Sequence, residues 1–335
     1  MTEKCTKAFP MLALVSLLLV VLNGCGFLGV GGSGESSGGK AVTISWLVRS
    51  TDKGLTTWEK QTAKDFEAAH PNIHVNIISV PNANYDQKLI TMNAGGTPPD
   101  IFSQWGSNSW IDWAYRGLVA DLAPYVASSH FSLDGINQSL LQQYKVNGKL
   151  YGIPFSTGGS YVFYNVDLFK KANLPLPPTN WNDASWNQDT FLHDAQEIAK
   201  QGSGSDKQFG VSNDLWPEDA IPLLFGGDIF PESAYTTGVV DHVQANSPQV
   251  QEAIQWQHDL VYKYKIAPTQ SEASTIGNGF MSGKIGMSMI GVWGFWVNQP
   301  ATFHYAAAPL PTLKDNKDVV FTDPWMMAKG SKHQQ

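Results

Sequence analysis

The sequence predicts an α/β fold, because segments with the pattern of strands alternate with segments that have the pattern of helices. Residues 41–102 run strand, helix, strand, helix, strand, an order typical of parallel strands covered by helices. Residues 160–165 add a strand whose large apolar side chains fall on both faces, as in a sheet that is covered on both sides. Residues 248–264 carry apolar residues at helical spacing. We therefore expect mainly parallel sheets flanked by helices.

The first 24 residues have the pattern of an export signal. Lys4 and Lys7 precede an apolar run that is too short for a stable membrane anchor. The run ends at Gly24 and Cys25, which resemble the lipobox of bacterial lipoproteins, in which the cysteine becomes lipidated. We expect residues 1–24 to be removed as a lipoprotein signal peptide and Cys25 to carry the lipid. Cleavage at a non-lipid site is the alternative, because Asn23 is unusual at its position.

Residues 25–40 are rich in glycine and serine and predict a flexible tether. The only other cysteine, Cys5, lies in the removed segment, so the exported chain has no disulfide and depends on core burial for its stability. A formal net charge of −7 disfavours binding to nucleic acid.

The next elements follow in order. A strand over 41–48 leads to a helix over 55–69, which the His-Pro-Asn stretch at 70–72 ends. A strand over 73–80, a helix over 85–94 ended by two glycines, and a short strand at 101–102 complete the pattern. Ligands of parallel sheets bind beyond the carboxyl ends of the strands. These ends carry Arg49 and Ser50 after the first strand, and Gln104 and Trp105 after the third.

The remaining chain continues the alternation. We expect helices, one of them broken, over 167–172, 188–201, 218–227, 248–264 and 275–282, and strands over 160–165, 209–214, 284–291, 304–311 and 319–328.

Short motifs spread along the chain resemble one protein family. They include FEAAHPNIHV from Phe66, YDQKL from Tyr85, GGTPPDI from Gly95, RGLVADL from Arg116, GKLYGIP from Gly148, YNVDLFKKA from Tyr164, PPTNW from Pro177, FMSGKIGM from Phe280 and APLP from Ala308. Together they resemble the extracellular solute-binding proteins of bacterial ABC sugar importers, the maltose-binding-protein-like family. Members typically continue beyond the point that corresponds to Ser331 and Lys332, so the resemblance implies a chain truncated at its C-terminus.

The resemblance implies a two-lobed periplasmic-binding-protein-like fold of type II, with ligand held between lobes that crossing hinge strands join. Residues 41–153 would form lobe 1, residues 154–308 lobe 2, and residues 309–335 would return to lobe 1. The small residues of 156–160, including Gly158, would form the hinge and line the cleft, because glycine absorbs backbone rotation and permits close approach.

A sugar site needs aromatic rings against C–H faces and planar polar groups for the hydroxyls. The aromatic candidates are Trp105, Trp216, Trp293 and Trp325, and the alternative for each is core packing. The polar candidates are Arg49, Ser50, Gln104, Gly158, Asn213, Asp228 and Asp323. For Arg49 the alternative is a solvated loop charge, and for the Asn and Asp residues it is turn capping.

The resemblance implies a non-catalytic receptor that captures a mono- or oligosaccharide and delivers it to the transmembrane subunits of an ABC permease. We expect an extracytoplasmic monomer anchored by the lipid at Cys25, with no cofactor, no metal and no nucleic acid partner. A secreted glycoside hydrolase is the alternative from the enzyme class, since a carboxylate pair is compatible with the sequence. The same fold with a polyamine or another non-sugar solute is a third.

Overall fold

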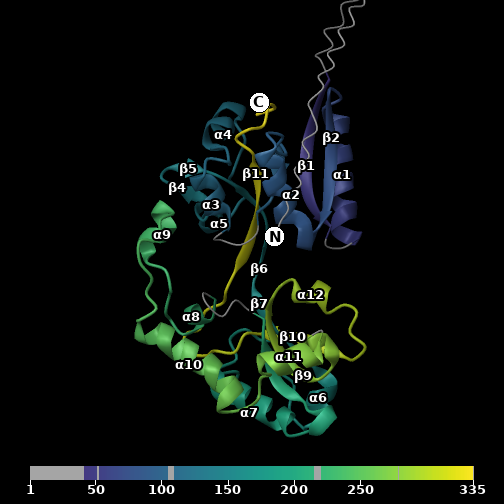
Figure 1. The fold of residues 1–335 in the computed structure, drawn as a ribbon, viewed down its shortest axis with the longest axis vertical. Helices are drawn as coiled ribbons and strands as arrows, with labels where there is room; N and C mark the ends of the chain where they lie inside the picture. Colours follow the sequence, from purple (N-terminus) through teal and green to yellow (C-terminus); the bar gives the residue numbers. More distant parts are fainter. Residues whose placement is uncertain (1–40, 51–52, 105–108, 215–219, 278, 335) are drawn as a thin grey trace, which may run out of the picture. The chain divides into compact units, whose positions relative to one another are not determined.

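The computed structural model describes residues 41–50, 53–104, 109–214, 220–277 and 279–334 (Figure 1). The elements are β1 (Val42–Ser50), α1 (Lys53–Ala69), β2 (Ile73–Pro81), α2 (Asn82–Ala94), β3 (Ile101–Phe102), α3 (Ser109–Tyr115), α4 (Ala123–Ser129), α5 (Gln138–Gln142), β4 (Lys145–Val146), β5 (Lys149–Leu150), β6 (Ile153–Gly158), β7 (Ser160–Asn165), α6 (Val166–Lys171), α7 (Gln188–Ala199), a 3₁₀ turn (Gly204–Asp206), β8 (Phe209–Asn213), α8 (Ala220–Leu224), α9 (Glu232–Thr237), α10 (Pro248–Tyr262), α11 (Gln270–Ile276), a 3₁₀ turn (Gly279–Ser282), β9 (Ile285–Gly291), α12 (Gly294–Val297), β10 (Tyr305–Pro309) and β11 (Phe321–Met327). Strand–helix alternation is confirmed.

The first sheet has the strand order β2-β1-β3-β11-β6. β1 is parallel to β2 along its whole length and parallel to β3, as the alternation of strands and helices predicts. β11 comes from the far end of the chain and pairs antiparallel with both β3 and β6. Figure 1 shows β6 and β11 side by side.

The second sheet has the order β10-β7-β9-β8 and corrects one expectation. Only β8 and β9 are parallel, whereas β7 runs antiparallel to both β9 and β10. The prediction of a mainly parallel sheet is therefore wrong here. The reason for the β7–β10 pair is connectivity: β7 carries the chain into this part of the molecule and β10 carries it out, so neighbouring strands must run in opposite directions.

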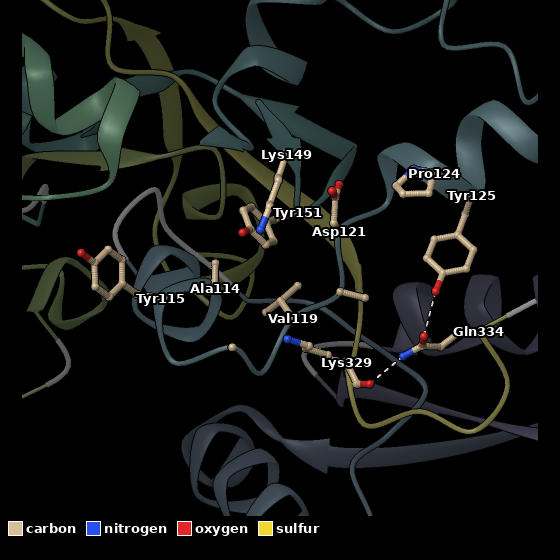
Figure 2. A pocket seen from close by; sticks show the side chains of 12 residues that line it. Ala114, Tyr115, Val119, Asp121, Pro124, Tyr125, Lys149, Tyr151, Lys329 and Gln334 are labelled. Atoms are coloured by element: carbon tan, nitrogen blue, oxygen red, sulfur yellow. Dashed lines mark hydrogen bonds between the residues drawn. The ribbon is translucent and has the colours of Figure 1, made fainter. Parts of the chain in front are cut away.

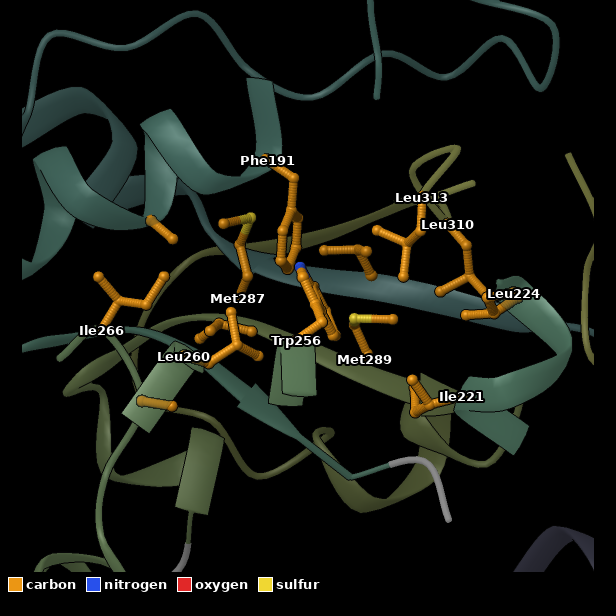
Figure 3. Packing of buried hydrophobic residues seen from close by; sticks show 14 of the residues in the cluster. Phe191, Ile221, Leu224, Trp256, Leu260, Ile266, Met287, Met289, Leu310 and Leu313 are labelled. Atoms are coloured by element: carbon orange, nitrogen blue, oxygen red, sulfur yellow. The ribbon is translucent and has the colours of Figure 1, made fainter. Parts of the chain in front are cut away.

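The two largest of four buried hydrophobic clusters among the described residues form the main cores of these sheets. The first contains Leu47, Tyr85, Phe102, Trp110 and Met326 among its buried members. The second fills the space between the second sheet and its helices, where Trp256 from α10 and Phe191 from α7 lie against Met287 and Met289 of β9 (Figure 3). Burial of such side chains stabilises by roughly 1.5 to 3 kcal/mol each.

Strand β7 is buried on both faces, as predicted. Val162 and Tyr164 point into the second core, and Phe163 points to the opposite face, where it packs with Phe209 and Phe280. The side chains of Val162 and Phe163 have no solvent-exposed area, so the aromatic strand is an interior strand of its sheet.

The chain passes from the first sheet to the second between β6 and β7, and glycines there allow close packing. A Cβ at Gly158 would lie 2.4 Å from Val292 Cγ1, and one at Gly159 would lie 2.4 Å from Asp318 Oδ2. The first sheet thus extends to Gly158, and on the way back Leu310, Leu313 and Val319 still pack in the second core before β11 begins.

The helix expected over 275–282 begins and ends earlier, at Gln270 and Ile276. Its start is a capping box, in which the Thr269 side chain accepts from the backbone of Glu272 and the Glu272 carboxylate accepts from the backbone of Thr269. Gly277, at φ +64°, ends the helix. The T-x-x-E spacing was the missed signal. Within the described ranges, no helix is both long and apolar enough to cross a membrane.

Candidate functional site

Arg49 lies at the end of β1, where the sequence predicts a ligand-facing side chain, and it is almost completely buried, at 7% exposed. Its guanidinium donates to the carbonyl oxygen of Ser103 at 3.2 Å, to Asp86 Oδ1 at 3.2 Å and to Gln104 Oε1 at 3.3 Å. The alternative for Arg49, a solvated loop charge, is therefore wrong. Through these hydrogen bonds Arg49 connects the end of β1 to Ser103 and Gln104, which follow β3.

Tyr85, from α2, lies beneath this guanidinium. The Cζ atom of Arg49 is 3.7 Å from the centroid of the Tyr85 ring, a cation–π distance. The Tyr85 hydroxyl donates to the carbonyl oxygen of Leu47 and accepts from the backbone N–H of Ser103. Burial raises the pKa of Tyr85 to about 12 and lowers the pKa of Arg49 from its usual value, and Tyr85 and Asp86 oppose the second shift. Arg49 remains charged at neutral pH.

Asp323 approaches the same place from β11. The hydroxyl of Ser156, on β6, donates to Asp323 Oδ2 at 2.7 Å, so the two side chains join the crossing strands. Burial raises the pKa of Asp323, while the Ser156 hydrogen bond and the positive charge of Arg49 act in the opposite direction. The charge of Asp323 likewise acts on Arg49. The structure thus brings together three predicted residues: Arg49, Gln104 and Asp323.

Trp325, two residues further along β11, belongs to a group of aromatic rings. It stacks on Phe155 at 4.0 Å between ring centroids and meets Trp46 edge-on at 5.1 Å. Trp58, on α1, is nearly parallel to Phe155 at 6.5 Å and is 46% exposed. We call Trp46, Trp58, Phe155 and Trp325 the aromatic group. Because only Trp46 of these is fully buried, the group presents ring surface that can cover the C–H face of a ligand.

Trp293 and Gly158 both neighbour Phe321 of β11. Trp293 precedes α12, is partly buried, and meets Phe321 of β11 edge-on at 4.7 Å. Phe321 pairs with Gly158 in the β6–β11 ladder. The Trp293 ring also covers the backbone of Gly291, where a Cβ would lie 2.1 Å from it. Trp293 thus lies beside the point where the chain crosses between sheets.

Other predicted residues lie elsewhere or have other partners. Ser50 is exposed at the last position of β1. Asp228 accepts from the backbone N–H of Phe230 and from the hydroxyl of Tyr235, the turn-capping arrangement that was its alternative. Asn213 ends β8, beside Met289 of β9. Trp105, Trp216 and Cys25 lie outside the described residues, as do 1–24 and the tether.

Sequence reasoning missed several members of the site. Tyr85 and Asp86 were available as the start of the YDQKL motif, but a helix start gave no sign that it would pair with the end of β1. Phe155 and Ser156 follow the GKLYGIP motif, and Trp46 and Trp58 have the pattern of core residues. The residues that join them, Asp323 and Trp325, lie more than 160 positions away in sequence, so no local pattern connects them.

A separate hollow of about 540 Å³ lies beside α3, α4 and the residues that follow β11. Figure 2 shows Lys149, Tyr151, Tyr115, Tyr125 and Lys329 around it. It is lined by none of the predicted ligand-binding residues. In the part of the chain that the structure describes, no group of three or more His, Cys, Asp or Glu side chains is placed to hold a metal ion.

Comparisons with known proteins agree with this architecture. Residues 50–335 match the family model described as bacterial extracellular solute-binding protein. The multiple sugar-binding protein of Streptococcus mutans is 29% identical over 53% of this chain and 39% of its own length. The galactooligosaccharide-binding protein of Bacillus subtilis is 25% identical over 95% of this chain and 70% of its own length.

Solved structures show the same fold. The ABC substrate-binding protein from Listeria monocytogenes in complex with cycloalternan superposes with a TM-score of 0.72 at 24% identity, over 88% of this chain and 73% of that one. The two-lobed fold expected from the motifs is therefore confirmed. The chain spans only about two fifths to a half of the length of the first curated relatives it matches. The family match covers most of the sequence, and the chain belongs to the bacterial extracellular solute-binding proteins.

Proposed function

We propose that this protein captures a carbohydrate without altering it and delivers it to an ABC importer. The observation that carries the proposal is the set of planar polar groups beside the aromatic group. Arg49 and Gln104 lie near the ends of β1 and β3, and Asp323 lies within β11. Trp325, two residues after Asp323, stacks on Phe155. Rings cover the apolar faces of a sugar and contribute about 1 to 2 kcal/mol each by area, and each hydrogen bond adds about 1 kcal/mol.

The relatives support this substrate class, because those named above bind sugars or galactooligosaccharides. Membership of the family supports an extracytoplasmic location and a permease as partner. We further propose that the Cys25 lipid holds the monomeric protein at the membrane, that residues 25–40 act as its tether, and that the crossing strands β6 and β11 act as the hinge between lobes. The chain would be one part of a longer receptor.

Closure around the sugar follows from differential affinity. A ligand shifts the balance between open and closed forms only if it makes additional contacts in the closed form. Trp293, Gly158 and Phe321 lie where the sheets meet, and Asp323 and Trp325 lie on the same crossing strand. A sugar that contacts both Trp293 and the Asp323–Trp325 segment would favour the closed form. We propose Ser50, Trp105, Asn213, Trp216 and Asp228 as further contacts of the closed form.

Calorimetric titration with maltose, mannobiose, lactose and galactooligosaccharides tests the proposal. We expect micromolar or tighter binding of at least one sugar with a change in tryptophan fluorescence, and loss of binding in Trp325→Ala and Trp293→Ala. Chromatography after long incubation should recover the sugar unchanged. Failure of every sugar to bind would refute carbohydrate capture, and release of shorter sugars would favour a hydrolase.

A further inference from the structure

Gln104 is a buried residue whose side-chain amide oxygen accepts a hydrogen bond, whereas its amide nitrogen has no acceptor among the described residues. It is 5% exposed and lies two residues after the end of β3. Among the residues that the structure describes, its side-chain hydrogen bond is the one it accepts from Arg49 Nη2, at 3.3 Å. Guanidinium carries donors and no acceptor, so the amide atom facing Arg49 must be the oxygen. The amide nitrogen of Gln104 therefore points away from Arg49.

That nitrogen has two N–H donors and no acceptor among the residues that the structure describes. It is not among the fully enclosed side-chain atoms that lack a partner, so it keeps some access to the space outside the protein, where a ligand can reach it. Such a group is a candidate for pairing with a ligand, since binding would then satisfy it.

The orientation of Gln104 is fixed from several directions. Arg49 also donates to the carbonyl oxygen of Ser103, the preceding residue. Tyr85 supports the guanidinium from below and accepts from the Ser103 backbone N–H. The backbone before Gln104 and its side-chain oxygen are thus held by the same two residues. An amide held in this way cannot flip to present its oxygen without breaking the contact to Arg49.

We propose that Arg49 is a positioning residue that makes Gln104 a donor-only contact for the bound sugar, an inference that rests on the proposed function. Gln104 Nε2 would then select a ligand oxygen that accepts at that point. Such an oxygen is a ring or glycosidic oxygen, or a hydroxyl whose own hydrogen is donated to a carboxylate such as Asp323. The Arg49 guanidinium already donates to Ser103, Asp86 and Gln104, so its role in binding is to orient Gln104 and the backbone of Ser103.

The positioning part can be tested without any sugar. In ¹⁵N-labelled protein the Gln104 side-chain amide is identified by its loss in Gln104→Glu, and its order parameter is measured. We expect a value near that of rigid backbone, about 0.85, in the wild type and below about 0.6 in Arg49→Lys, because lysine lacks the planar fork. Equal order parameters in the two proteins would overturn the positioning role.

The donor part is tested by titrating Gln104→Glu with the tightest binder among maltose, mannobiose and lactose. The carboxylate still accepts from Arg49, so melting temperature should be kept or raised, but the donor is lost and affinity should fall about fivefold or more. Gln142→Glu, an exposed position on α5, makes the same charge change and should bind like wild type.

The outcomes separate the two proposals. Unchanged affinity in Gln104→Glu, with a wild type that binds sugar, overturns the donor role and leaves carbohydrate capture intact. A wild type that binds none of the sugars refutes carbohydrate capture and the sugar contact together, and the amide measurement still decides whether Arg49 orients Gln104.

Discussion

Replacing Asp323 by asparagine should stabilise the protein and weaken sugar binding at the same time. Asparagine keeps the shape and can still accept the Ser156 hydroxyl at Oδ1, but it removes a carboxylate whose burial raises its pKa. A charged group that is costly to bury destabilises the fold in its ionised form.

The direction in which Asp323 changes stability with pH follows from proton linkage. The folded-state pKa of Asp323 lies above its ordinary value of 3.8, so between these two values the folded protein binds more protons than the unfolded one. Its contribution to stability therefore falls as pH rises from 3.8 through the folded pKa. Asp323→Asn should have a higher melting temperature than wild type at pH 7, and the difference should shrink as the solution is acidified through that window.

The effect on binding has the opposite sign. A sugar hydroxyl that donates to a carboxylate makes a charge-assisted bond worth about 1.5 to 3 kcal/mol, against about 1 kcal/mol for a neutral acceptor. We expect affinity to fall roughly three- to thirtyfold by calorimetry. Asp318→Asn is the matched control, because Asp318 is another carboxylate with a burial-raised pKa that accepts from the Ser160 backbone. It should bind sugar like wild type. Unchanged affinity in Asp323→Asn, or a lower melting temperature, would refute this reasoning.

Three further predictions concern packing and capping. Gly210→Ala should lower the free energy of unfolding by about 3 kcal/mol in urea titrations, because its Cβ would lie 2.1 Å from the Ala195 carbonyl oxygen of α7; a change below 1 kcal/mol would contradict the close packing of α7 on β8. Glu272→Gln should cost about 1 kcal/mol at pH 7 through loss of the charged cap. Lys207 lowers the pKa of Glu272 to about 2, so this difference should vanish as pH falls from 4.5 toward 2, and a difference independent of pH would count against it. Trp325→Ala should make the fluorescence of the aromatic group insensitive to sugar, and a preserved response would assign the signal to Trp293.

Local patterns predicted most elements because each reflects a local cause. The parallel β1–β2–β3 unit follows from its alternation with α1 and α2, and the buried β7 follows from its apolar faces. The antiparallel neighbours of β7 were not predicted, because pairing between β7 and β10 depends on where the chain leaves the lobe, about 140 residues later.

In the candidate site, too, the sequence predicted features with a local cause and missed those that depend on distant residues. Position after a strand correctly singled out Arg49 and Gln104 as neighbours, since strand ends of one sheet lie together. It could not show that Arg49 is buried and held by Tyr85, because that contact depends on how α2 packs. Nor could it show that Phe155 stacks on Trp325, a pairing made by the β6–β11 ladder.

The place of β11 in the first sheet has a consequence for biogenesis. This strand lies between β3 and β6, yet it follows every other described strand in the sequence, whereas the described strands of the second sheet lie between Ser160 and Pro309. During synthesis and export the second lobe can close its hydrogen-bonded ladder first. Until β11 emerges, β3 and β6 present open edges that can pair with other chains. The growing chain therefore passes through a half-assembled stage in which the first sheet has unpaired strand edges.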